Sequence, residues 1–139
     1  LVDYLRQKAR PNLFSSALTI PDVAANIASV EILQESEDLV KKLWANGNFL
    51  KKELASLGFD TGASETPITP VIIGEAADAK AFSAKLFERG VFATAIVFPT
   101  VPRGTARIRA MVSAAHSEDD LRFGVGQFAA VGREMGIIS

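Results

Sequence analysis

The chain has 139 residues, of which 48% are apolar, and this combination is typical of one folded domain with its own core. Its 15 basic and 16 acidic residues nearly balance, so nothing in the charge favours nucleic acid or an anionic membrane as a partner. With no cysteine and a single histidine, the sequence excludes disulfides, thiolate metal sites and histidine-based metal clusters.

The lack of cysteine also favours a cytoplasmic protein, or a mitochondrial one if the source is a eukaryote. No apolar run approaches the length that spans a bilayer, so we expect no contact with a membrane. The first residues show neither an initiating methionine nor a signal-peptide pattern, and they read like the middle of a helix. We therefore expect the sequence to be a piece of a longer protein.

Two helices are predicted in the first quarter of the chain. Residues 1–9 have helical spacing of apolar side chains, and Pro11 is expected to end that helix before an irregular connector over residues 12–18. Thr19 then begins a second helix. Residues 23–33 of this helix carry so few polar side chains that we expect them to be buried, either within the chain or against another subunit.

The rest of the chain alternates between helical and strand patterns. Helices are predicted over residues 36–57, 76–89 and 117–135, and strands over residues 66–74, 91–98 and 106–114. Gly58 and Gly90 end the first two of these helices, and Ser117 with Asp120 forms a capping box for the last. Pro67 and Pro70 cannot donate to a sheet, so they place the first strand at an edge. This order predicts an α+β fold, a small mixed or antiparallel sheet with helices packed on it.

The strand that begins at Ala106 has two distinct faces. Small and apolar residues occupy alternate positions, while Arg107, Arg109, Met111 and Ser113 point the other way. Two guanidinium groups roughly 7 Å apart on one face indicate an anion nearby. Both arginines being solvated, or paired with the chain's own carboxylates, explains the pattern equally well.

Other chemistry-bearing patterns are scarce. There is no glycine-rich phosphate loop between a strand and a helix, and no nucleophile beside a histidine. His116 is the only side chain that ordinarily titrates near neutral pH, and we expect it to bond backbone groups; the competing role is proton transfer. The residues alone therefore predict an α+β domain that binds an anion on its arginine strand.

Several stretches resemble the C-terminal part of glycine C-acetyltransferases, also called 2-amino-3-ketobutyrate CoA ligases, which are α-oxoamine synthases. They are residues 10–18, 58–62, 64–71, 98–109 and 113–116, the longest reading Phe-Pro-Thr-Val-Pro-Arg-Gly-Thr-Ala-Arg-Ile-Arg. The family consists of enzymes dependent on pyridoxal phosphate (PLP) that condense an amino acid with an acyl-CoA. The resemblance implies that residues 21–139 are the C-terminal small domain of a fold-type I PLP-dependent transferase. Residues 1–20 would then be the tail of the large PLP-binding domain and a connector.

The resemblance also implies roles for two residues. Arg109 matches the arginine that binds the substrate carboxylate, and Ser15 matches a hydroxyl residue that reaches the phosphate of the PLP bound in the neighbouring subunit of a homodimer. The Schiff-base lysine lies upstream of the matching stretches, so no catalytic residue and no metal ligand is expected here. The chain alone is expected to be inactive.

The implied reaction joins glycine and acetyl-CoA to give 2-amino-3-ketobutyrate and CoA. Two alternatives remain within the family, 8-amino-7-oxononanoate synthase and 5-aminolevulinate synthase. From a different class, the chain could be a non-catalytic domain that binds an anion or another protein.

Overall fold

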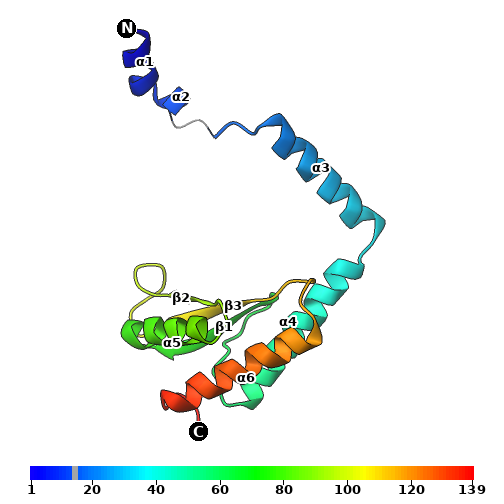
Figure 1. Ribbon diagram of the computed structural model, residues 1–139, viewed down its shortest axis with the longest axis vertical. Helices are drawn as coiled ribbons and strands as arrows, with labels where there is room; N and C mark the ends of the chain where they lie inside the picture. Colours follow the sequence, from blue (N-terminus) through cyan, green and yellow to red (C-terminus); the bar gives the residue numbers. More distant parts are fainter. Residues whose placement is uncertain (14–15) are drawn as a thin grey trace. The chain divides into compact units, whose positions relative to one another are not determined.

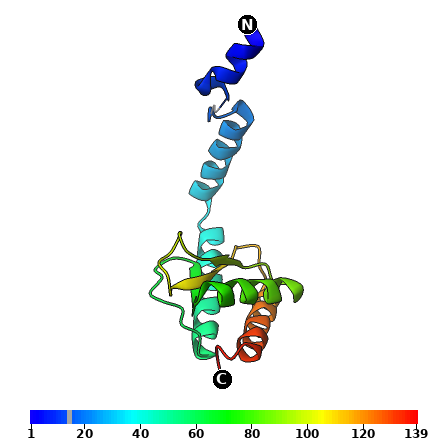
Figure 2. The same ribbon diagram turned by 90° about the vertical axis from the view of Figure 1, so that its left-hand side faces the viewer.

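A computed structural model describes residues 1–13 and 16–139 of the chain (Figures 1 and 2). Its internal contacts divide the chain into two compact units, Leu1–Glu37 and Asp38–Ser139. The boundary predicted from the family resemblance, between residues 20 and 21, concerns a larger protein and stays a prediction. No helix within the described residues is both long enough and apolar enough to cross a membrane.

The described residues of the first unit form three helices, α1 (Val2–Lys8), α2 (Arg10–Leu13) and α3 (Ile20–Glu35). The first predicted helix does end before Pro11, at Lys8, but the connector expected from residue 12 was wrong at its start, because residues 10–13 form a helical turn of their own. Proline is tolerated there because the first turn of a helix leaves its N–H groups without partners in any case. Thr19 caps α3 as predicted, and its side chain accepts a hydrogen bond from the backbone N–H of Asp22 at 3.4 Å.

Helix α3 is exposed along its whole length, and none of its residues is buried. The predicted burial within the chain is therefore wrong. An apolar helix is buried only when another element covers it, and the other elements of this unit are one helix of seven residues and one turn of four. Burial against another subunit stays a prediction.

The second unit is the predicted α+β fold. Its elements are α4 (Asp38–Ser56), β1 (Ile68–Gly74), α5 (Ala76–Glu88), β2 (Thr94–Ile96), β3 (Ala106–Met111) and α6 (Glu118–Glu134). The strands form one antiparallel sheet in the order β1-β3-β2. Strand β1 lies at an edge, which confirms the inference from its two prolines.

Strands β2 and β3 are shorter than the predicted ranges 91–98 and 106–114. Strand β2 ends where the chain turns, since the carbonyl of Val97 accepts a hydrogen bond from the N–H of Thr100. Strand β3 ends at Met111, because the N–H of Ser113 is bonded to the side chain of His116 within a turn. Residues after that point keep the alternating pattern without pairing to a neighbour.

The core lies between one face of the sheet and helices α4, α5 and α6. Val71 of β1 and Ile108 of β3 stand opposite each other in the register and are fully buried. Phe82 of α5 meets them from the helix side, and Figures 1 and 2 show α4 and α6 side by side in the same layer. Burial of these apolar side chains, each worth about 1.5–3 kcal/mol, holds the sheet in place.

The helix ends follow the predicted signals. The hydroxyl of Ser117 accepts the N–H of Asp120 at 3.1 Å, and the carboxylate of Asp120 accepts the N–H of Ser117 at 2.8 Å. The capping box is thus confirmed, with Asp in the place usual for Glu. Gly58 and Gly90 have φ values of +96° and +83°, a conformation that side chains disfavour.

Candidate functional site

The face of the sheet opposite the core carries the two arginines. In the antiparallel register Arg109 stands level with Pro70 on β1 and Thr94 on β2, and Arg107 stands level with Ile72 and Ile96. Residues paired in this way point to the same side of a sheet. No helix of the described unit covers this side, so it is an open face with two cationic groups among apolar neighbours.

The two arginines differ in what they bind. Arg107 is half-buried, and its Nε donates a hydrogen bond to the carbonyl oxygen of Thr105 at 3.0 Å. Arg109 is exposed, and in the described part of the chain neither arginine pairs with a carboxylate. Of the two explanations that the sequence left open, pairing with the chain's own acids is therefore excluded within the described residues. The guanidinium of Arg109 is available to a planar anion, which it can bind through two parallel hydrogen bonds.

A third arginine lies at one end of the same strand. The connection from β2 to β3 holds Arg103, whose guanidinium stacks over the ring of Phe98 at 4.4 Å from the ring centroid. This pair was not predicted from the sequence. An aromatic residue and an arginine five positions apart in a proline-rich segment can nevertheless indicate such a stack. The stack adds positive charge near the Arg107 end of β3.

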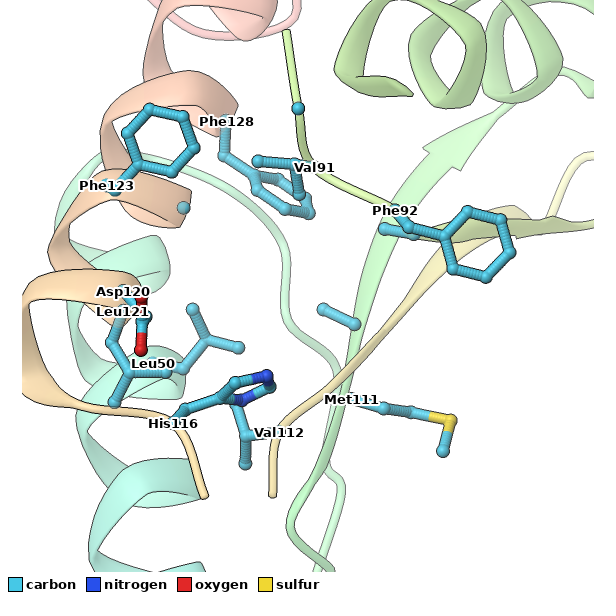
Figure 3. A pocket seen from close by; sticks show the side chains of 14 residues that line it. Leu50, Val91, Phe92, Met111, Val112, His116, Asp120, Leu121, Phe123 and Phe128 are labelled. Carbon is cyan, nitrogen blue, oxygen red and sulfur yellow. The ribbon is translucent and has the colours of Figure 1, made fainter. Parts of the chain in front are cut away.

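A pocket of about 580 Å³ opens at the other end of β3 (Figure 3). It is lined mainly by apolar side chains from α4, α6, the end of β3 and residues 90–93. In Figure 3, Phe92 and Met111 point outward at its rim, and they are 84% and 58% exposed. This pocket could not be predicted from the sequence, because nothing in a local pattern shows that α6 leaves space beside residues 90–93.

The two titratable side chains that line the pocket, His116 and Asp120, each make hydrogen bonds within the chain. Nδ1 of His116 accepts the N–H of Ser113 at 3.1 Å, which confirms the expectation that this histidine bonds the backbone. Hydrogen bonds from the side chain and then the backbone of Ser117 lower the pKa of Asp120 below its ordinary value. The pocket is therefore apolar in character, and its two titratable side chains serve the turn and the helix cap.

The remaining expectations concern the cofactor and metals. Ser15 lies outside the described residues, so its predicted contact with a cofactor phosphate stays a prediction. Among the described lysines none is buried, Lys51 donates to backbone carbonyls, and Lys85 pairs with Glu134. Within residues 1–13 and 16–139 there is also no cluster of three metal-binding side chains.

Comparison with known proteins shows the family. A family model described as aminotransferase class I and II matches residues 1–128, and the chain belongs to that family. Within that family, the chain is similar to PLP-dependent α-oxoamine synthases, the group to which its relatives and the similar solved structures belong.

The relatives are bacterial enzymes named 8-amino-7-oxononanoate synthase. That of Coprothermobacter proteolyticus is 59% identical over 138 residues, and that of Thermosipho melanesiensis is 54% identical over the same length. Each alignment covers 99% of this chain and 35% of the relative, so the chain spans about a third of the length of these enzymes.

Solved structures with the same fold are serine palmitoyltransferases. The enzyme from Sphingomonas wittichii has a TM-score of 0.82 and 30% identity, covering 99% of this chain and 35% of that one. A serine palmitoyltransferase from S. paucimobilis with a bound PLP–myriocin aldimine has a TM-score of 0.82 and 27% identity, covering 98% and 35%. The predicted fold and the PLP-dependent family are thus confirmed. These relatives do not carry the name glycine C-acetyltransferase, which was the more specific expectation from the sequence.

Proposed function

We propose that the complete enzyme carrying this chain is an α-oxoamine synthase of the 8-amino-7-oxononanoate synthase type. It joins the α-carbon of an amino acid to an acyl group and releases CoA. The observation that supports this most is the uncommitted guanidinium of Arg109 on the open face of β3, in a chain 59% identical to such an enzyme.

Arg109 would bind the carboxylate of the amino acid and hold the α-carbon in one orientation. Its neighbours on the open face include Pro70 and Met111, and such apolar surroundings would strengthen an ion pair once the rest of the enzyme covers this face and excludes water. Bound PLP supplies an electron sink for the carbanion chemistry. This chain contributes positioning of the substrate, which converts a meeting of two molecules into a reaction of aligned groups.

The name of the relatives' product defines the substrates. It is a nine-carbon acid with an amino group on C8 beside a ketone on C7. Alanine that loses its carboxylate as CO₂ supplies C8 and C9, and a seven-carbon dicarboxylic acyl thioester supplies C1 to C7. The balanced reaction therefore releases both CoA and CO₂.

Glycine C-acetyltransferase is the second candidate. It is favoured by the amino-acid sequence of residues 64–71 and 98–104, which resembles that enzyme most. Here glycine and acetyl-CoA give 2-amino-3-ketobutyrate and CoA, and the carboxylate of glycine is retained. The two candidates therefore differ in whether CO₂ is released.

The test is an assay of the complete, PLP-loaded enzyme with the two substrate pairs. Free CoA thiol and CO₂ are measured for alanine with the seven-carbon dicarboxylic thioester, and for glycine with acetyl-CoA. Equal amounts of CoA and CO₂ from the first pair support the proposal. Release of CoA without CO₂ from the second pair alone would replace it with glycine C-acetyltransferase. No release from either pair would favour the non-catalytic alternative.

The assembly of the enzyme follows from the same proposal. The exposed apolar residues of α3, such as Val23, Ile27 and Val30, would be covered by the rest of the protein or by a second subunit. Residues 1–20 would belong to the large domain, and Ser15 would reach the PLP phosphate of the neighbouring subunit. A homodimer is therefore expected, and light scattering coupled to size-exclusion chromatography of the complete enzyme measures its mass directly.

A further inference from the structure

Asn46 of α4 joins a helix to the turn that follows the arginine strand. Its Nδ2 donates one hydrogen bond to the carbonyl oxygen of Ser113 at 2.9 Å and another to that of His116 at 3.1 Å. An amide NH₂ has two hydrogens, so both are used on the two carbonyls. One half-buried side chain thus bonds residues 67 and 70 positions away in the sequence.

The surrounding contacts keep both partners in place. The next residue on α4 is Gly47, where an added Cβ would lie only 3.0 Å from Cα of Pro67, so the helix runs close against the start of β1. The turn is closed from inside by the bond from the N–H of Ser113 to Nδ1 of His116. A second bond joins the N–H of Ala115 to the hydroxyl of Ser113 at 3.0 Å. Asn46 therefore connects α4 to the turn at residues 113–116, and other contacts hold each of these two parts in place.

Arg109 occupies the last position at which β3 pairs with strands on both sides. Strand β2 pairs with β3 only up to Thr94, which stands opposite Arg109. On the other side Arg109 stands opposite Pro70, which has no N–H to donate. Beyond this point Ala110 and Met111 pair with β1 alone. The next fixed point along the chain is the turn that Asn46 holds.

We infer that Asn46 is a positioning residue for the amino-acid substrate. By tying the turn at Ser113 and His116 to α4, it fixes the end of β3. This in turn fixes the direction in which the Arg109 side chain projects from the open face. This inference rests on the proposed role of Arg109, but the anchoring hydrogen bonds do not depend on it.

The experiment uses the complete, PLP-loaded enzyme with the variants Asn46→Ala and Asn46→Asp. The first removes the two donors, and the second replaces them with a carboxylate of similar shape that repels both carbonyls. Leaving two carbonyls without donors is expected to raise the KM for the amino acid about tenfold, while the KM for the acyl thioester changes less than about twofold. Asn48→Asp is the matched control, because it adds the same charge to an exposed position of the same helix.

A double-mutant cycle with Arg109→Ala separates positioning from general stability. If Asn46 acts through Arg109, Asn46→Ala has little further effect on the amino-acid KM once the arginine is gone. The inference is overturned if the two effects add fully, if both KM values rise together, or if both Asn46 variants fail to fold. An inactive parent enzyme would instead refute the proposed function itself, and the role of Asn46 with it.

Discussion

The close approach of α6 to the Phe59 ring makes one glycine testable. A Cβ added at Gly132 would lie 2.5 Å from Cζ of Phe59 and 2.9 Å from Cγ1 of Ile138. The ring cannot move away easily, since it packs edge-on against Phe82 at 6.1 Å and Phe128 at 6.2 Å between ring centroids. Gly132→Ala therefore forces a well-packed cluster apart.

The magnitude follows from two opposing effects. Overpacking a core costs about 1–3 kcal/mol, while replacing glycine by alanine inside a helix gains about 1 kcal/mol. Because both contacts at Gly132 are far below an ordinary separation, we place the cost at the upper end, about 3 kcal/mol, and expect a net loss of about 2 kcal/mol. Gly126 lies in the same helix with no heavy atom within 4 Å of an added Cβ, so Gly126→Ala is expected to gain about 1 kcal/mol.

Urea denaturation followed by circular dichroism measures both variants. With a slope of roughly 1–2 kcal/mol per molar urea, Gly132→Ala lowers the midpoint by about 1–2 M and Gly126→Ala raises it by about 0.5–1 M. If Gly132→Ala unfolds at the same or a higher urea concentration than the parent, the packing argument for this glycine fails. If Gly126→Ala also destabilises, helix propensity is not what distinguishes the two positions.

Three further predictions concern single side chains. Thr69 is fully buried and its hydroxyl has no hydrogen-bond partner among the described residues, so Thr69→Val should raise the free energy of unfolding by about 1 kcal/mol in urea denaturation; a loss would show that the hydroxyl is satisfied. The lowered pKa of Asp120 means that its carboxylate stabilises the fold above the ordinary Asp pKa of about 3.9, and that this stability is lost as pH falls through the lowered value. Urea midpoints of Asp120→Asn and the parent should therefore differ at pH 6 and converge as the pH falls well below the ordinary Asp pKa, and a constant difference would contradict the assignment. Ser15→Ala in the complete enzyme should weaken PLP retention by about 1–3 kcal/mol in dialysis against cofactor-free buffer, and unchanged retention would remove Ser15 from the site.

Local signals in the sequence were sufficient for much of the fold. The capping box at Ser117 and the proline-bearing edge strand β1 depend on interactions a few residues long, and both were predicted correctly. The pattern of Arg107 and Arg109 on one face also follows from alternation alone. That Arg109 stays uncommitted while Arg107 binds a carbonyl could not be predicted, because it depends on where Thr105 lies in the folded turn.

Other features depend on partners distant in the sequence. No local pattern marks Asn46, since its two acceptors lie 67 and 70 residues further along the chain. The exposure of α3 could not be read from its composition, because an apolar helix looks the same whether its cover lies in the same chain or in another. Likewise the resemblance indicated the α-oxoamine synthases, but the relatives carry the name 8-amino-7-oxononanoate synthase, and the chain spans only about a third of their length.

The most direct measurement is the affinity of the complete, PLP-loaded enzyme for its amino-acid substrate when Arg109 is changed. Titration followed by the absorbance of the bound cofactor gives the dissociation constant. We expect Arg109→Ala to weaken binding by about 3 kcal/mol, which is more than a hundredfold, because a carboxylate would lose two charge-assisted hydrogen bonds. Arg109→Lys should remain poor, since an ammonium group cannot reproduce the two-pronged geometry. Arg107→Ala is the matched control on the same face, and it should weaken binding less than about tenfold. Equal affinity of Arg109→Ala and the parent would contradict the assignment of this strand to the substrate carboxylate.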